Sequence, residues 1–192
     1  VTGSNPVSPN KNINMIDNFI FFSLMLNLQE PQTIFEFKSN SNLEDWQVID
    51  DTVMGGVSNG LLRSDADGNG VFMGDVSIEN NGGFSSIQLS MESIKVNSEN
   101  SIKLIVKGDG SSFQFRIKNS KYDRHSYVVN FKTSGKWETI LIPMNEMTPR
   151  FRGYKMSFSN FNKSKIESIG FLKSSKKNTS FKLQIKSVSI VR

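Results

Sequence analysis

Short runs in which every second residue is apolar are the feature that most restricts the fold of this 192-residue chain. The alternation is clearest in five segments: residues 86–91, 102–106, 113–117, 127–131 and 181–185. Successive side chains of a strand point to opposite faces of a sheet, so a period of two indicates strands with one buried face. Glycine, asparagine, aspartate and serine separate these runs, as turn residues do. The sequence therefore predicts an all-β domain, either a β-sandwich or a barrel.

Three local features refine this expectation. Residues 108–110, Gly-Asp-Gly, predict a hairpin-type turn between the strands on either side of them. Near the C-terminus the apolar positions shift to Val188 and Ile190, which predicts a bulge or bend near residues 186–187. Only residues 143–147 and 162–167 have a pattern that allows a helical turn.

The chain is expected to divide into residues 1–33, a disordered tail with a short apolar stretch, and residues 34–192, a single β-sandwich domain. The apolar stretch, residues 16–28, is shorter than the roughly 20 residues that a membrane-spanning helix needs, so no transmembrane span is expected. It has the length of the hydrophobic region of a secretory signal. The compartment is therefore left open between the bacterial cytoplasm and export.

Composition excludes several classes of site. The chain has no cysteine, so disulfides, thiolate metal sites and a cysteine nucleophile are excluded. It has one histidine, His125, and no Gly-x-Ser-x-Gly elbow. Residues 65–70 begin like an EF-hand loop, but the twelfth position is Val76 instead of glutamate, which favours a simple turn. We expect no catalytic residue, metal or cofactor, and the diffuse net charge of +5 favours no nucleic-acid partner.

Two glycine corners, residues 50–58 and 79–86, each place a Gly-Gly pair between short polar residues and an apolar residue. Glycine adopts positive φ without a steric penalty, and Asp or Asn side chains can bond nearby main-chain groups and close such turns. The corners therefore serve either a ligand or the fold alone. If Gly56 or Gly83 has positive φ, its replacement by valine is expected to cost roughly 1–3 kcal/mol.

Acidic and basic side chains near these corners are candidates for binding. Asp50 and Asp51 are neighbours on a strand and point to opposite faces, so a role in closing the turn is favoured over a paired-carboxylate site. Arg150 and Arg152 flank an aromatic residue, and their forked donors suit carboxylates, phosphates or sugar hydroxyls. Pairing of these arginines with the two aspartates, which would pin the loops, is an equal alternative. The full set of candidate binding residues is Trp46, Asp50, Asp51, Met54, Gly55, Gly56, Asn80, Asn81, Gly82, Gly83, Phe84, Asp109, Arg150 and Arg152.

Several motifs together resemble the thirty-kilodalton complex I intermediate-associated protein family, over about residues 34–191. In chain order they are Trp46-x-x-x-Asp50-Asp51-Thr52-Val53-Met54-Gly55-Gly56-Val57-Ser58, Phe72-x-Gly74-x-Val76-Ser77, Glu79-Asn80-Asn81-Gly82-Gly83-Phe84-Ser85-Ser86, Lys107-Gly108-Asp109-Gly110, Trp137-x-x-x-x-Ile142-Pro143, Phe151-Arg152-Gly153 and Ile169-Gly170-Phe171. The resemblance implies a galactose-binding-like jelly-roll β-sandwich. Mitochondrial members of the family are assembly chaperones for NADH:ubiquinone oxidoreductase, and single-domain bacterial members share the domain.

The resemblance implies a non-enzymatic binding module whose partner is a protein, such as a subunit of a membrane complex that it helps to assemble. The alternative is a carbohydrate-binding module, in which Trp46 would supply an aromatic platform and Asp50, Asn80 and Arg152 the hydrogen bonds. An enzyme is the least favoured class, because only His125 and the aspartate pair could carry its chemistry.

Overall fold

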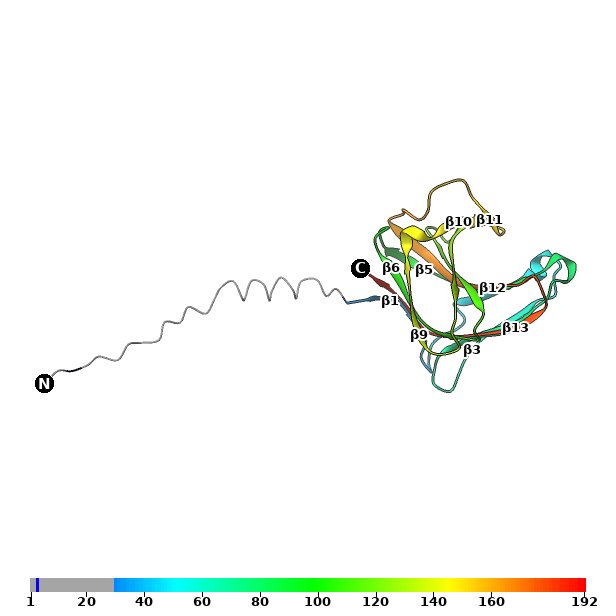
Figure 1. Cartoon of the computed structure of the whole chain (residues 1–192), viewed down its shortest axis with the longest axis horizontal. Coiled ribbons are helices and arrows are strands. Elements are labelled where there is room, and N and C mark those ends of the chain that lie inside the picture. Colours follow the sequence, from blue (N-terminus) through cyan, green and yellow to red (C-terminus); the bar gives the residue numbers. More distant parts are fainter. Residues whose placement is uncertain (1–2, 4–29) are drawn as a thin grey trace. The chain divides into compact units, whose positions relative to one another are not determined.

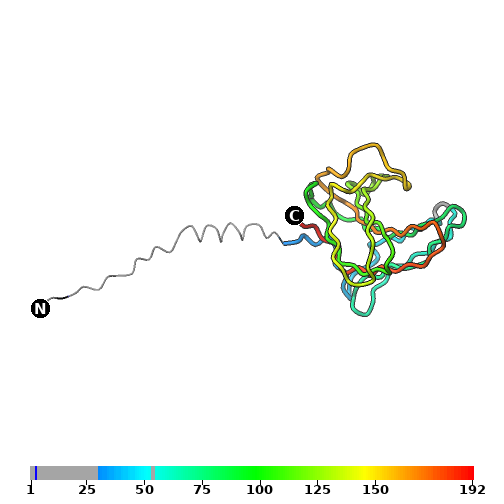
Figure 2. Tube along the Cα trace, viewed as in Figure 1, coloured from blue at the N-terminus to red at the C-terminus, as the bar shows by residue number. Residues whose placement is uncertain are grey.

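The computed structural model describes residue 3 and residues 30–192. The apolar stretch at residues 16–28, and with it the predicted signal-like segment, lies outside the described residues, as does nearly all of the predicted tail. The first strand, β1 (Gln32–Glu36), begins two residues before the expected start of the domain. It pairs with the end of the last strand, so the two ends of residues 31–192 lie side by side (Figure 2).

Two antiparallel sheets make up the domain (Figure 1). The six-stranded sheet has the order β3-β4-β13-β6-β9, with β1 also paired to β13. Its further strands are β3 (Asn59–Ser64), β4 (Gly70–Val76), β6 (Ser101–Gly108), β9 (Glu138–Pro143) and β13 (Thr179–Val191). The other sheet has seven strands in the order β11-β10-β8-β7-β12-β5-β2. These are β2 (Trp46–Asp50), β5 (Phe84–Lys95), β7 (Ser112–Lys118), β8 (Ser126–Lys132), β10 (Thr148–Phe151), β11 (Tyr154–Lys155) and β12 (Lys165–Ser174).

The apolar residues predicted to alternate in these strands form the core between the sheets. Phenylalanine carries much of it: Phe72 packs on Phe181 with ring centroids 4.7 Å apart, and Phe115 packs on Phe171 at 5.2 Å. All four are almost fully buried. Large aromatic side chains bury much apolar area per residue, which lets a chain of modest hydrophobic content form a sizeable core.

The predicted all-β sandwich is confirmed, and the strand order is that of a jelly roll. The chain crosses from β5 in one sheet to β6 in the other and returns to β7, and it crosses again from β8 to β9 and back to β10. The predicted bulge is also confirmed, because the register of β13 shifts between Ile185 and Ser187. A short 3-10 helix, η3 (Met144–Glu146), occupies the first of the two segments in which a helical turn was allowed.

Two local expectations were wrong. Residues 108–110 do not close a hairpin, because β6 and β7 belong to different sheets and the turn carries the chain across the sandwich. A period of two identifies a strand with one buried face but does not identify its partner. The segment at residues 162–167 is not helical, since β12 begins at Lys165 and forms a central strand between β5 and β7. A register shift between Ile166 and Ser168 interrupts its alternation and conceals the strand from a count of period two.

Within residues 30–192, the structure has no helix of the length and apolar character that crossing a membrane requires. The helical segments there are three single 3-10 turns: η1 (Asp51–Met54), η2 (Glu79–Asn81) and η3. The first two lie inside the predicted glycine corners.

Gly170 in β12 provides a test of how closely the central strands pack. A Cβ at this position would lie 2.7 Å from the carbonyl oxygen of Ile87 on β5, an atom of the backbone that cannot rotate away. We expect Gly170→Ala to lower the free energy of unfolding by roughly 1–3 kcal/mol, measured by urea denaturation, because the strand pair must open to accept the methyl group. Ser174→Ala, at the exposed end of the same strand, is the control and should change it by less than about 0.5 kcal/mol. Equal stability of the two variants would contradict the close approach.

Candidate functional site

The carboxylate of Asp51 joins the two glycine corners. The backbone N–H of Ser58 donates to its Oδ1 at 3.0 Å, and the N–H groups of Gly83 and Phe84 donate to its Oδ2 at 2.6 and 3.1 Å. The hydroxyl of Ser58 also donates to Oδ2. Asp51 is fully buried. A residue expected to close one turn therefore holds together segments that are about 30 positions apart in the chain.

Hydrogen bonds together have a larger effect than burial on the pKa of Asp51 and so keep its carboxylate charged. Burial alone would raise the pKa of this carboxyl, but the hydroxyl of Ser58 and the N–H groups of Gly83, Phe84 and Ser58 together hold the pKa below its usual value. The side chain is therefore ionised at neutral pH. Its negative charge is balanced by oriented main-chain dipoles instead of a basic side chain.

The four glycines of the corners have two different roles. Gly55 and Gly83 have φ values of 89° and 132°, in the region that side chains other than glycine rarely adopt. Gly56 does not have positive φ, so strain of that kind is not the reason for glycine there. Instead, a Cβ on Gly56 would lie 2.2 Å from Oδ1 of Asp51, and one on Gly82 would lie 2.6 Å from Oδ2. These two glycines leave the space that the buried carboxylate occupies.

The other candidates near the corners have structural contacts. Trp46 is buried and stacks on Phe37, with ring centroids 5.6 Å apart. The N–H of Gly60 donates to Oδ2 of Asp50 at 3.0 Å. The side-chain amide of Asn80 donates to the carbonyl of Gly55 at 3.0 Å and so forms a second link between the corners. Asn80 and Asn81 have left-handed φ values of 53° and 61°, Phe84 begins β5, and the backbone of Met54 ends η1.

The remaining candidates lie elsewhere. Asp109 accepts the N–H of Lys182 at 2.9 Å and so ties the turn at residues 108–110 to β13. Arg150 donates to the carbonyl of Gly153 at 3.0 Å, and the guanidinium of Arg152 lies 5.5 Å from the ring centre of Phe151. Both arginines belong to the β10–β11 edge of the seven-stranded sheet, whereas β2 and the glycine corners lie at its other edge. Five strand spacings separate β10 from β2, about 24 Å along the sheet. The structure thus does not bring the arginines to Asp50 or Asp51.

His125 precedes β8 and contacts aromatic rings. Its ring centre lies 4.9 Å from that of Phe158 and 5.4 Å from that of Tyr127. The aspartate pair lies at the far edge of the same sheet, beyond β7, β12 and β5. Within residues 30–192, no group of three or more histidine and acidic side chains is placed to hold a metal ion.

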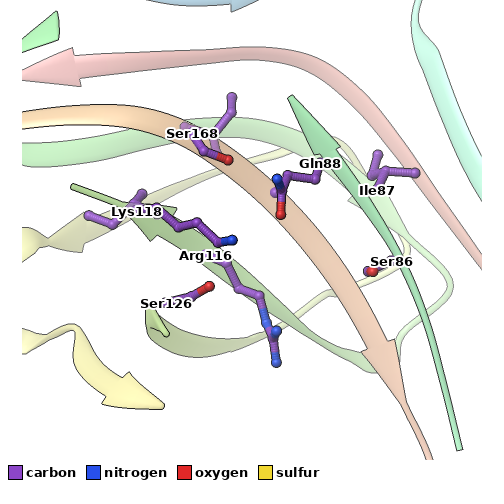
Figure 3. A pocket seen from close by; sticks show the side chains of 10 residues that line it. Ser86, Ile87, Gln88, Arg116, Lys118, Ser126 and Ser168 are labelled. Carbon is purple, nitrogen blue, oxygen red and sulfur yellow. The ribbon is translucent and has the colours of Figure 1, made fainter. Parts of the chain in front are cut away.

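A shallow pocket of about 40 Å³ lies on the outer face of the seven-stranded sheet, away from the core (Figure 3). Its walls come from four neighbouring strands and include Ser86 and Gln88 of β5, Arg116 and Lys118 of β7, Ser126 of β8 and Ser168 of β12. Gly170 is paired on one side with Gln88 and on the other with Arg116. Because glycine has no side chain, this central position is left hollow.

Several small outward side chains in and around this pocket are buried. Ser126, Val128, Ser168 and Leu172 alternate with core residues and so face away from the other sheet, yet each has at most 7% of its surface exposed. Neighbouring atoms therefore cover these short side chains. Arg116 is one of the longer outward side chains that line the pocket among them.

Arg116 carries an unbalanced positive charge in this hollow. Its Nε and Nη2 groups donate to Oε1 of Gln114 at 3.2 and 2.8 Å, and no described carboxylate forms an ion pair with it. Burial of the guanidinium, with a further contribution from the charge of Arg150, lowers the pKa of Arg116 to about 10. Burial and the charge of Arg116 also lower the pKa of Lys118, although Asp123 acts in the opposite direction. The charge of Arg116 thus interacts with those of two other cationic side chains, Arg150 and Lys118.

The pocket residues were not among the sequence-derived candidates. Gln114, Arg116 and Lys118 occupy the outward positions of a strand, where polar side chains usually face water. The available signal was a run of three long polar residues between the buried Phe113, Phe115 and Ile117. That signal does not distinguish a solvated face from a hollow one.

A second, more open groove of about 490 Å³ lies beside the glycine corners. Asp75 and Glu79 give it acidic character, and Ser180 donates a hydrogen bond to Asp75 at 2.6 Å. The side chain of Asn178 accepts the N–H of Ile78 at 3.0 Å and closes one side. This groove is lined by none of the predicted binding residues.

Comparison with protein families gives one match to most of the domain. The family model described as "Complex I intermediate-associated protein 30 (CIA30)" matches residues 35–185. The search of curated proteins gave no match.

The solved structures that resemble the fold include carbohydrate-binding modules. The family 11 module of the cellulosomal cellulase Lic26A-Cel5E of Clostridium thermocellum has a TM-score of 0.62 at 16% identity, over 84% of this chain and 94% of that one. The Clostridium thermocellum family 11 module in complex with a beta-1,3-1,4-mixed-linked tetrasaccharide has a TM-score of 0.60, also at 16% identity, over 85% and 96%. A point mutant of the family 29 module CBM29-2 gives 0.52 at 13% identity, over 85% and 92%. At these identities the similarity establishes the fold alone.

Replacement of Asp51 by asparagine tests whether its carboxylate holds the corners together. Either orientation of the amide directs an NH2 group toward a main-chain N–H donor, so at least one hydrogen bond is lost and a buried donor is left without an acceptor. We expect Asp51→Asn to lower the free energy of unfolding by roughly 3 kcal/mol or more, measured by urea denaturation. Asp67→Asn, in an exposed turn, is the matched control and should cost less than about 0.5 kcal/mol. A cost for Asp51→Asn as small as that of the control would contradict this role.

The contribution of Asp51 is also expected to depend on pH. Its pKa is 3.8 in the reference state and lower in the folded protein, so on acidification the unfolded chain takes up the proton first. The stability difference between wild type and Asp51→Asn should be constant above about pH 5 and should shrink as the pH falls through the folded-state pKa. Chemical denaturation of both proteins between pH 7 and pH 2 measures it. Other carboxyl groups with lowered pKa values titrate in both proteins, so the stability difference between the two proteins reports on Asp51. A stability difference that grows on acidification would refute the role assigned to Asp51.

Proposed function

Because the chain belongs to the complex I intermediate-associated protein 30 family, we propose that it is a non-catalytic module that binds a protein partner and assists assembly of a membrane-bound respiratory complex. The observation that carries the proposal is the family match, which spans nearly all of the sandwich. Mitochondrial members of the family have the corresponding role as assembly chaperones for NADH:ubiquinone oxidoreductase.

The placement of the ionisable side chains supports a binding role over catalysis. Asp51 is buried and uses its oxygens in hydrogen bonds within the fold. His125 packs on Tyr127 and Phe158, at a distance of several strands from that carboxylate. General acid-base chemistry needs its groups within hydrogen-bonding reach of one substrate, and these two groups cannot share one.

A carbohydrate-binding module is the second candidate, and the observation that favours it is the similarity of the fold to such modules. Two features weigh against it. Trp46, the proposed aromatic platform, is buried in the core. The pocket on the seven-stranded sheet is lined by hydroxyl, amide, aliphatic and cationic side chains, with no aromatic ring among the described residues that line it.

A pull-down from native membranes tests the proposal. The tagged protein should enrich subunits of a respiratory complex over the tag alone, identified by mass spectrometry after mild detergent extraction. Failure to enrich subunits of a respiratory or another membrane complex would refute the assembly role.

The carbohydrate alternative is tested in parallel on a glycan array, with and without calcium. We expect no binding under either condition. Saturable binding to a glycan, together with an empty pull-down, would replace the proposed function by the alternative.

A further inference from the structure

We propose that the hollow on the outer face of the seven-stranded sheet binds a carboxylate side chain of the protein partner, with Arg116 as the principal contact. The inference deepens the proposed function and rests on it, because it names the chemistry by which a protein partner is recognised. It assigns a site to residues of the strands β5, β12, β7 and β8, among them Ser86, the last residue of the second glycine corner.

The size of the hollow selects a single small group. Pockets that enclose a whole ligand usually have volumes of roughly 300–1,000 Å³, whereas this one has about 40 Å³. It has room for one planar group that a larger molecule presents. Gly170 provides the room, and Gln88 and Arg116 border it on either side.

The charge of the hollow selects an anion. Arg116 donates from Nε and Nη2 to Gln114, and its Nη1 group makes no hydrogen bond to another residue in the described range 30–192. A partly buried charge without a counter-ion is costly, and a bound carboxylate would provide one. The planar guanidinium matches the two oxygens of a carboxylate, and such charge-assisted bonds are among the strongest in proteins.

Other groups on the same face can assist. The Arg150 and Lys118 side chains lie close enough to Arg116 for their charges to interact with it. Ser126 and Ser168 add hydroxyl donors to the lining of the pocket, whereas the hydroxyl of Ser86 donates to the carbonyl oxygen of Ile49. All of these groups stand on strands, which hold them in fixed positions and so favour recognition of a particular side chain on a partner surface.

An acidic protein segment fits these observations better than an acidic polysaccharide. A sugar acid carries its carboxylate directly on a rigid ring, which would have to lie at the mouth of the 40 Å³ hollow. The carboxylate of a glutamate or aspartate stands at the end of a flexible aliphatic stem and can enter while the partner's backbone remains outside. We therefore assign the site to an acidic side chain of a protein.

Titration with an oligoglutamate peptide, followed by amide chemical shifts of the labelled protein at fixed low ionic strength, tests the site. We expect saturable shifts at Gln88, Arg116, Ser126 and Ser168, and no such shifts with an oligoglutamine peptide. Arg116→Gln should weaken binding by about tenfold or more, the loss expected when a hydrogen-bonded charge is removed. Arg63→Gln is the matched control, because Arg63 is an exposed arginine on β3 of the other sheet.

Two outcomes would overturn the assignment: no binding of oligoglutamate, with or without Arg116-dependent binding of oligogalacturonate, or equal weakening by Arg116→Gln and Arg63→Gln. Arg116→Lys keeps the charge but loses the planar fork, and it should bind with intermediate affinity. This variant also serves as the test if Arg116→Gln does not fold, since affinity equal to the wild type would then refute recognition by the guanidinium.

The membrane pull-down separates this inference from the proposed function. If the wild-type protein enriches respiratory subunits and Arg116→Gln enriches them equally, the carboxylate site is refuted while the assembly role stands. If the wild type enriches none, the assembly role fails, and oligoglutamate binding then reports an acidic-ligand site that serves another partner. Loss of enrichment in Arg116→Gln, with retention in Arg63→Gln, is the result that supports both.

Discussion

The buried carboxylate of Asp51 is the constraint on which one end of the sandwich depends. It accepts hydrogen bonds from Ser58, which leads into β3 of the six-stranded sheet, and from Gly83 and Phe84, where β5 of the seven-stranded sheet begins. The Ser58 hydroxyl in turn accepts the N–H of Ser77, directly after β4. A single negative charge thus links both sheets. Its burial is tolerated because oriented N–H groups replace the water that it loses.

This arrangement assigns different tasks to different parts of the molecule. The glycine corners, which carry the most specific sequence motifs of the family, are occupied by contacts that the fold requires. Trp46, Asp51 and Asn80 are each committed to such contacts. The outer face of the seven-stranded sheet is different, because Arg116 stands there in a hollow without a carboxylate partner among the described residues. The proposed protein-binding role is therefore assigned to the sheet and not to the corners.

The sequence predicts the structure correctly where the physical signal is local. Residues such as Ile102, Leu104 and Val106 alternate because one face of their strand is buried, and all three are in the core. The bulge in β13 was visible as a shift of phase. The local signal is lost at β12, where a register shift between Ile166 and Ser168 breaks the period. It is also insufficient at residues 108–110, where the pairing partner depends on contacts far along the chain. The sequence does not identify the pocket residues, because an outward arginine in a strand has the same sequence pattern on a flat surface and in a hollow.

By itself, the sequence determined that the chain is an all-β sandwich, that its glycine corners are built turns and that it belongs with a known family, because periodicity, turn chemistry and motif order are properties of neighbouring residues. Only the tertiary structure decided which residues meet. It placed Arg150 and Arg152 at the opposite edge of the sheet from Asp50 and Asp51, turned the side chain of Asp51 inward, and brought Gln88, Gly170 and Arg116 together across three strands. Strand order and sheet curvature are set by the packing of the whole core, and no local pattern encodes them.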